Sequence, residues 1–178
     1  MCHQAASALS QNKNVLYITM EMAEERIAGR IDANLLGISM EDLHMLNRKL
    51  FNEKIAKLQS KTTGTLIIKE YPTASAGANH YRALVNELAL KRTFKPDLIF
   101  IDYINICASS RFKPGANVNS YTYIKAIAEE LRGLAVELDV PIVTATQTTR
   151  TGFVSTDIGL EDTSESFGLP ATADFMFA

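Results

Sequence analysis

Three polar residues that could take part in catalysis each stand at the end of an apolar, largely β-branched run. They are Glu21 after residues 15–20, Asp102 after residues 98–101, and Gln147 after residues 142–146. Short apolar strands that alternate with helical stretches predict a parallel sheet covered on both faces. Ligands of such sheets bind at the carboxyl ends of the strands, so two acids and an amide would meet at one edge. This layout is typical of a nucleotide-hydrolysing site.

Each of the three side chains suits a different chemical role. Asp102 suits a magnesium ion bound through water, because magnesium keeps several waters and takes few protein ligands. Glu21 lies between Met20 and Met22, and apolar neighbours desolvate a carboxylate and make it a stronger base toward an attacking water. Gln147 can both donate and accept hydrogen bonds, so it could sense a γ-phosphate.

Each residue also has a purely structural interpretation, and the pattern alone leaves both open. Asp102 could cap the loop that follows its strand. Glu21 could be a favourable charge at the start of the next helix, whose dipole attracts an acid there. The amide of Gln147 could bond neighbouring backbone.

Composition places the chain among ordinary globular proteins. It has 178 residues, 47% hydrophobic and 21% charged, with a formal net charge of −2, which predicts one domain with a real core and no extended disorder. The charge argues against a uniformly basic surface, although a few loops could still neutralise phosphates. Cys2 and Cys107 have neither metal-ligand nor redox spacing, so we expect reduced thiols in a cytoplasmic protein. No signal peptide or membrane-spanning run is present, and no membrane partner is expected.

Hydrophobic periodicity predicts alternating strands and helices along the whole chain. Helices are expected within residues 1–11, 24–36 and 39–61 (capped by Ser39), from Thr73 or Ser75 through Leu88, and over residues 124–138. Strands are expected at 15–20, 65–70, 98–102, 142–146 and 174–178. Alternation of this kind predicts a doubly wound α/β fold, a mainly parallel sheet of about five strands with right-handed crossovers.

Two polar loops follow the Asp102 and Gln147 strands. They cover residues 108–118, with Arg111 and Lys113, and residues 148–161, with Arg150. Polar chain that buries little apolar area does not offset its ordering entropy, so we expect both loops to be mobile. Arg111 and Lys113 could contact phosphates or be merely solvated.

Taken in order, these segments resemble one family. Residues 16–22, 98–103, 147–150, and 165–166 with 173–174 are similar to four motifs of DnaB-type replicative helicases: the catalytic-glutamate strand, the Walker B strand, the Gln-x-x-Arg motif and the final core motif. Residues 121–138 and 168–177 look closest to the replicative helicases of T-even-type phages. The resemblance covers nearly the whole chain at matching spacing.

The resemblance implies a RecA-like motor core that hydrolyses ATP with magnesium. Glu21 would activate the attacking water, Asp102 would hold the magnesium shell, and Gln147 would read the γ-phosphate. Arg150 would pass that state to the loop lining a hexamer channel, and Arg111, Lys113 and Arg150 would contact DNA. The implied partners are single-stranded DNA, further copies in a homo-hexamer, a primase and a helicase loader.

One departure from the family pattern is clear. The Gly-rich phosphate loop that belongs before the first helix does not occur within residues 1–178. We therefore expect a single partial core, with the phosphate loop before residue 1 and the last strands and arginine finger after residue 178. A RecA- or RadA-type recombinase core, or a non-catalytic assembly module of the same fold, remains an alternative. A nucleotide-cofactor oxidoreductase is disfavoured because no Gly-x-Gly-x-x-Gly opens a helix.

The missing phosphate loop makes a direct prediction for the 178-residue chain. It should hydrolyse ATP no faster than background, because the loop's backbone amides and lysine normally cradle the phosphates. A phosphate-release assay measures this. Turnover that disappears on Glu21→Ala or Asp102→Asn would show that another segment supplies those contacts.

Overall fold

A computed structural model describes residues 1–113, 117–149, 159 and 168–177. Its centre is a four-stranded sheet in the order β2-β1-β3-β4, and every neighbouring pair is parallel. The strands are β1 (Val15–Thr19), β2 (Leu66–Glu70), β3 (Leu98–Asp102) and β4 (Ile142–Thr144). The helices are α1 (Cys2–Ser10), α2 (Glu24–Leu36), α3 (Met40–Met45), α4 (Arg48–Gln59), α5 (Ala78–Arg92), α6 (Ser120–Leu138) and α8 (Gly168–Thr172), with a 3₁₀ turn η1 (Ile104–Ile106).

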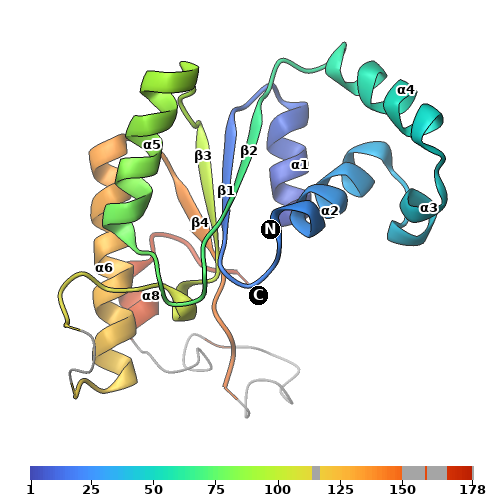
Figure 1. Ribbon diagram of the computed structural model, residues 1–178. Coiled ribbons are helices and arrows are strands. Elements are labelled where there is room, and N and C mark those ends of the chain that lie inside the picture. The colour runs from blue at the N-terminus through green and yellow to red at the C-terminus, as the bar shows by residue number, and fades with distance from the viewer. Residues whose placement is uncertain (114–116, 150–158, 160–167, 178) are drawn as a thin grey trace.

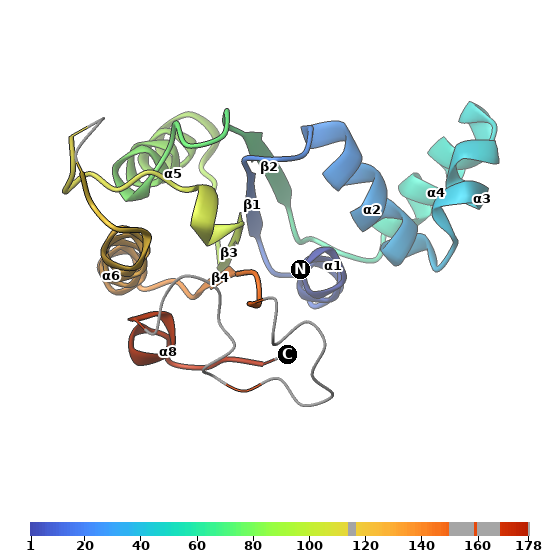
Figure 2. The same cartoon turned by 90° about the horizontal axis from the view of Figure 1, so that it is seen from below.

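Helices cover both faces of the sheet, as the apolar strand runs predict (Figures 1 and 2). Successive side chains of a strand point to opposite faces. Leu16 and Ile18 therefore pack with α5 and α6, whereas Val15 and Tyr17 pack with α1 and α2. All four side chains are buried. The doubly wound α/β prediction is confirmed.

Helix α6 has the clearest amphipathic pattern. Ile124, Ile127, Leu131 and Leu134 fall at helical spacing and are buried against the sheet, whereas Glu129 and other charged residues occupy the remaining surface. No helix in the described part of the chain is both long and apolar enough to cross a membrane.

The segment predicted as one helix from Ser39 to Lys61 forms two. Ser39 begins α3 as predicted, with its hydroxyl accepting a hydrogen bond from the Asp42 amide at 3.0 Å. The helix ends at Met45, and Asn47 starts α4 by accepting from the Leu50 amide at 2.9 Å. The Asn47 side chain accepts from an amide in the first turn of α4, which has no backbone partner within that helix. This cap favours a new helix start at residue 48, so the predicted single helix is divided into α3 and α4.

Two further boundaries differ from the prediction. Helix α5 begins at Ala78, after Gly77, and not at Thr73 or Ser75. Residues 174–177 form no strand, so the described sheet has four strands and not five. The carboxylate of Asp174 pairs with Arg132 of α6 at 2.7 Å.

Gly77 and Gly133 give a matched test of this packing. A Cβ at Gly77 would lie 1.9 Å from the Ala108 carbonyl oxygen, whereas one at Gly133 would meet nothing within 4 Å. We predict that Gly77→Ala lowers the free energy of unfolding by roughly 1–3 kcal/mol or prevents folding. Gly133→Ala, within α6, should raise it by roughly 0.5–1 kcal/mol. Urea unfolding followed by circular dichroism measures both; equal effects would contradict the close approach at Gly77.

Candidate active site

The parallel sheet brings the three predicted residues to one edge. Asp102 is the last residue of β3, Glu21 lies two residues beyond β1, and Gln147 lies three residues beyond β4. Thr19 pairs with Asp102 in the register of β1 and β3. The Met20 amide also donates to the Asp102 carbonyl at 3.1 Å, so the chain that leads to Glu21 starts beside Asp102.

Asp102 is tied to a buried phenol. The Tyr17 hydroxyl donates to Asp102 Oδ2 at 3.0 Å, and the Cys2 thiol lies 3.8 Å from the same hydroxyl. Tyr17 is 1% exposed. Burial raises the pKa of its phenol above the ordinary value, and the Asp102 carboxylate raises it further. Tyr17 therefore stays protonated and keeps one carboxylate oxygen of Asp102 in place.

Gln147 is joined to the residue that directly follows β3. Its amide nitrogen donates to the Tyr103 hydroxyl at 3.2 Å. One residue earlier, the Thr146 hydroxyl donates to Asn105 Oδ1 at 2.9 Å, and the Ile104 amide donates to the carbonyl of Ala145. The chain leaving β4 is therefore bonded along the turn that follows β3.

Glu21 sits on an anchored turn but points to solvent. The Thr19 hydroxyl donates to the Met22 carbonyl at 2.8 Å and accepts from the Met22 amide at 3.1 Å. Glu21 itself is exposed. The burial that Met20 and Met22 predicted for this carboxylate is absent, because the bonded turn directs it outward.

The first turn of α2 is joined to the end of β2 by two carboxylates. The Glu70 amide donates to Glu24 Oε1 at 2.8 Å, and the Glu24 amide donates to Glu70 Oε2 at 3.3 Å. These reciprocal bonds fix the start of α2 against the sheet edge. The position of the Glu21 turn is therefore set from both sides.

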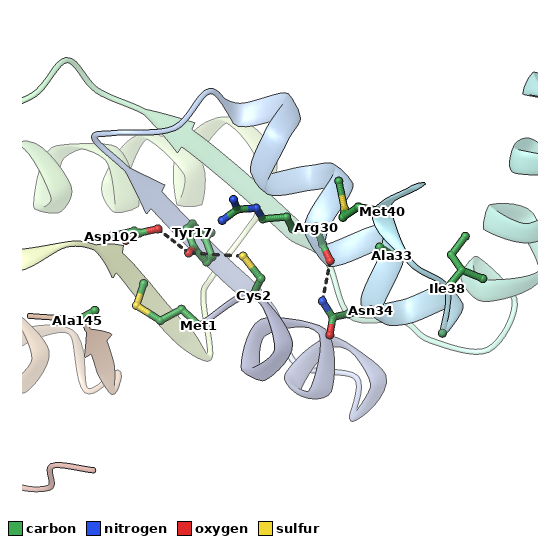
Figure 3. Close-up of a pocket in the computed structure, with 11 residues that line it drawn as sticks. Met1, Cys2, Tyr17, Arg30, Ala33, Asn34, Ile38, Met40, Asp102 and Ala145 are labelled. Atoms are coloured by element: carbon green, nitrogen blue, oxygen red, sulfur yellow. Dashed lines mark hydrogen bonds between the residues drawn. The ribbon is translucent and has the colours of Figure 1, made fainter. Parts of the chain in front are cut away.

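A pocket of about 640 Å³ opens beside Asp102 (Figure 3). Residues from the start of α1, from α2 and from the sheet edge line it: Met1, Cys2, Tyr17, Arg30, Ala33, Asn34, Gly37, Ile38, Met40, Asp102 and Ala145. Of the three predicted residues, only Asp102 is part of this lining. Figure 3 shows Arg30 on the α2 side of the pocket, across from Asp102 and Tyr17. Met1 and Cys2, at the start of α1, line the pocket. The backbone amides at the start of a helix have no partner within the helix and can bind phosphate.

The donor set beside this pocket fits a water-bound magnesium ion and no dedicated metal cage. The described residues contain no cluster of three or more histidine, cysteine, aspartate or glutamate side chains that could hold a metal. Magnesium binds through one or two carboxylates together with waters and substrate phosphates. Asp102, with Oδ2 held by Tyr17, matches that need.

The predicted DNA-contacting cations lie in different settings. Arg111 is paired with Glu129 and lies 3.9 Å from Glu130, both on α6. Lys113 is exposed, without a hydrogen bond or ion pair to any residue that the structure describes. Arg150 and most of residues 148–161 lie outside the described residues. The segment before Lys113 is hydrogen-bonded to Glu130 of α6, and the mobility expected for residues 108–118 stays a prediction.

Tyr17 and Tyr103 are the site residues that sequence reasoning missed. Tyr103 carried a signal, since it directly follows Asp102. Tyr17 did not, because its contact with Asp102 joins residues 85 positions apart.

A parallel α/β core with its polar residues at the carboxyl edge, beside a pocket at a helix start, is typical of nucleotide-binding α/β domains. The model of the DnaB-like helicase C-terminal domain family matches residues 1–159. The chain therefore belongs to the DnaB-like helicase C-terminal domain family. This match favours the helicase interpretation over the recombinase alternative.

Relatives and solved structures agree. The chain is 49% identical over 181 residues to the DnaB-like replicative helicase of Enterobacteria phage T4, covering all of this chain and 38% of the relative. It is 26% identical to the replicative DNA helicase DnaB of Helicobacter pylori strain 26695, covering 99% of this chain and 36% of that protein. The chain thus spans under two-fifths of these relatives.

Two solved structures share the fold. One is an ATPase domain, which superposes with a TM-score of 0.75 at 19% identity, covering 97% of this chain and 62% of that one. The other is a DnaB-like replicative helicase, studied with its interactions with primase, which superposes with a TM-score of 0.71 at 21% identity, covering 97% and 43%.

The reactivity of the Cys2 and Cys107 thiols can test how deeply each is buried. Burial raises the pKa of Cys107 to about 11, so at pH 8 only about one thiol in a thousand is the reactive thiolate. Cys2 is half-buried at the pocket rim. We predict that a disulfide reagent modifies Cys2 at least about ten times faster than Cys107. Cys2→Ser should remove the fast phase; a fast phase that persists in that variant would contradict the burial of Cys107.

Proposed function

We propose that this chain is the motor core of a replicative DNA helicase, in which ATP hydrolysis drives translocation along single-stranded DNA and unwinding of duplex. The observation that carries the proposal is that Asp102, Glu21 and Gln147 follow parallel strands at one sheet edge, with Asp102 lining the pocket, in a chain 49% identical to the phage T4 replicative helicase.

Asp102 would hold the water shell of magnesium at the edge of the pocket. Tyr17 donates to Oδ2, which leaves the other carboxylate oxygen for a metal-bound water. The bound ion would neutralise charge on the phosphates. Because Tyr17 stays protonated and buried, Asp102 keeps one orientation through the cycle.

Glu21 and Gln147 would act on the γ-phosphate side. Glu21 is exposed on an anchored turn, so it can accept a proton from an attacking water once nucleotide fills the pocket. Gln147, joined to Tyr103, can exchange that bond for a phosphate oxygen. Arg150 follows three residues later and would carry the change to DNA.

The proposed assembly is a ring of six copies around single-stranded DNA. Arg111, Lys113 and Arg150 would contact DNA phosphates. Contacts of this kind hold DNA without reading its bases. A primase is the proposed partner, since a solved structure of the same fold was studied with primase. A helicase loader is proposed from the family resemblance, and a cytoplasmic location follows from the same reasoning.

The motor proposal can be tested by exchanging segments. The matching segment of the phage T4 relative, 38% of its length, is replaced by this chain, and DNA-stimulated ATP hydrolysis and strand separation are measured. We predict an active chimaera. Glu21→Gln and Asp102→Asn should each lower turnover by at least about 100-fold, because each removes a group that acts on the reacting phosphate.

Glu25→Gln is the matched control, since Glu25 is an exposed acid in the first turn of α2. It should leave turnover within about two-fold, as expected for a surface substitution. Equal losses at Glu21 and Glu25 would contradict the catalytic role. A folded chimaera that forms the ring but never hydrolyses ATP would favour a non-catalytic assembly module.

A second prediction concerns DNA binding by the same chimaera. Lys113→Ala and Arg150→Ala should each weaken single-strand binding for all sequences and reduce the slope of log affinity against log salt by about 0.7. Lys57→Ala on the projecting helix α4 should leave the slope unchanged. Arg150→Ala should also impair DNA-stimulated hydrolysis. An unchanged slope for Lys113→Ala would mean that Lys113 is merely solvated.

A further inference from the structure

The first turn and the middle of α6, through Tyr123 and Glu130, hold the chain that leads into the first polar loop. We call residues 108–113 the loop base. The Ser109 hydroxyl donates to Glu130 Oε1 at 2.5 Å, and the Ser110 amide and hydroxyl donate to Glu130 Oε2 at 3.1 and 3.0 Å. The Ser109 amide donates to the Tyr123 hydroxyl at 3.2 Å, and the rings of Phe112 and Tyr123 lie 5.8 Å apart.

Two neighbouring acids of α6 therefore have different environments. The Glu130 side chain is 10% exposed and accepts from both serines of the loop base. The Glu129 side chain is 38% exposed and is the nearer acid to Arg111, whose own side chain is 50% exposed and whose Nε lies 3.9 Å from Glu130 Oε1. Glu130 makes several enclosed bonds, whereas Glu129 makes an open ion pair.

The strengths of these contacts should differ accordingly. Several hydrogen bonds to one enclosed carboxylate hold firmly, because breaking them leaves a poorly solvated charge. An exposed ion pair contributes little and is screened by salt. Glu129 also lies 4.0 Å from Lys125, one turn earlier on α6, so it keeps a cation when Arg111 leaves.

We propose that Glu130 fixes the loop base while Glu129 holds Arg111 as an exchangeable partner, which a phosphate of single-stranded DNA displaces. The guanidinium of Arg111 suits this exchange, because it binds carboxylate and phosphate in the same planar, bidentate manner. The Glu129 carboxylate then competes with the DNA phosphate for Arg111, so it lowers the affinity for DNA. This inference rests on the proposed function of the loop as a DNA contact.

The neighbouring acids allow a test with opposite signs. Binding of fluorescein-labelled oligo(dT) is measured over a salt series for the 178-residue chain and for the phage T4 chimaera. Glu129→Gln removes the nearer acidic partner of Arg111, leaving only the longer contact with Glu130, and should raise affinity roughly 1.5- to 5-fold. Glu130→Gln removes the same charge but loosens the loop base, and should lower affinity several-fold. Glu137→Gln, which breaks the Arg82 pair farther along α6, is the matched control and should change nothing.

A double-mutant cycle isolates the exchange itself. In an Arg111→Ala background, Glu129→Gln should have no effect, since no guanidinium is left to release. Arg111→Ala alone should reduce the salt slope by about 0.7. If Glu129→Gln still raises affinity without Arg111, or if Glu129→Gln and Glu130→Gln both raise it, the acids act only through net charge and the exchange is refuted.

Amide hydrogen exchange separates anchoring from folding. Glu130→Gln should speed exchange at Ser109 and Ser110 at least about ten-fold, with α6 protected as before; Glu129→Gln should not. Unchanged exchange in Glu130→Gln would overturn the anchoring role. If neither wild-type protein binds single-stranded DNA, the proposed function fails; if both bind and the cycle is flat, the exchange alone fails.

Discussion

The register between β1 and β3 is the constraint on which the site depends. It sets Thr19 opposite Asp102 and Tyr17 opposite Phe100. Side chains alternate between faces, so a slip of one residue would move Tyr17 to the other face of the sheet and remove its bond to Asp102. Burial on both faces prevents that slip, because the strands are enclosed by α1 and α2 on one side and by α5 and α6 on the other.

The fold could be predicted where the residues along one segment determine its structure. Apolar strand runs and the regular spacing of Ile124, Ile127 and Leu131 in α6 are local signals of this kind, and those elements appear as predicted. The start of α5 could not be predicted, because it depends on Gly77 lying against the backbone of Ala108, far along the chain. The apolar run at 174–177 predicted a fifth strand, but strand pairing depends on a neighbouring strand far along the chain, and the described sheet pairs no strand there.

The candidate site divides in the same way. The common edge of Glu21, Asp102 and Gln147 follows from strand direction alone, so sequence was sufficient for it. Their contacts are set by partners distant in sequence: the Tyr17 phenol on Asp102 and the Tyr103 hydroxyl on Gln147. The exposure of Glu21 depends on the hydrogen bonds between Thr19 and Met22 that shape the turn. The apolar neighbours Met20 and Met22 do not predict that geometry.

In the proposed motor, the chain from Asp102 to Ser109 would link the nucleotide pocket to the DNA-contacting loop. It begins at the carboxylate beside the pocket and ends seven residues later at the serine held by Glu130. Between them the chain is fixed to two other segments: the Ile104 amide bonds the Ala145 carbonyl, and the Ala108 amide bonds the Ala76 carbonyl. Cys107 is buried in the core between these bonds. In the proposed motor, a displacement of the carboxyl end of β3 on nucleotide binding would be passed along this covalent segment to the loop base, while Tyr17 keeps the Asp102 carboxylate in its orientation. Gln147 joins the same segment through Tyr103, and nucleotide state and DNA contact would therefore be coupled through β3 without a separate moving domain.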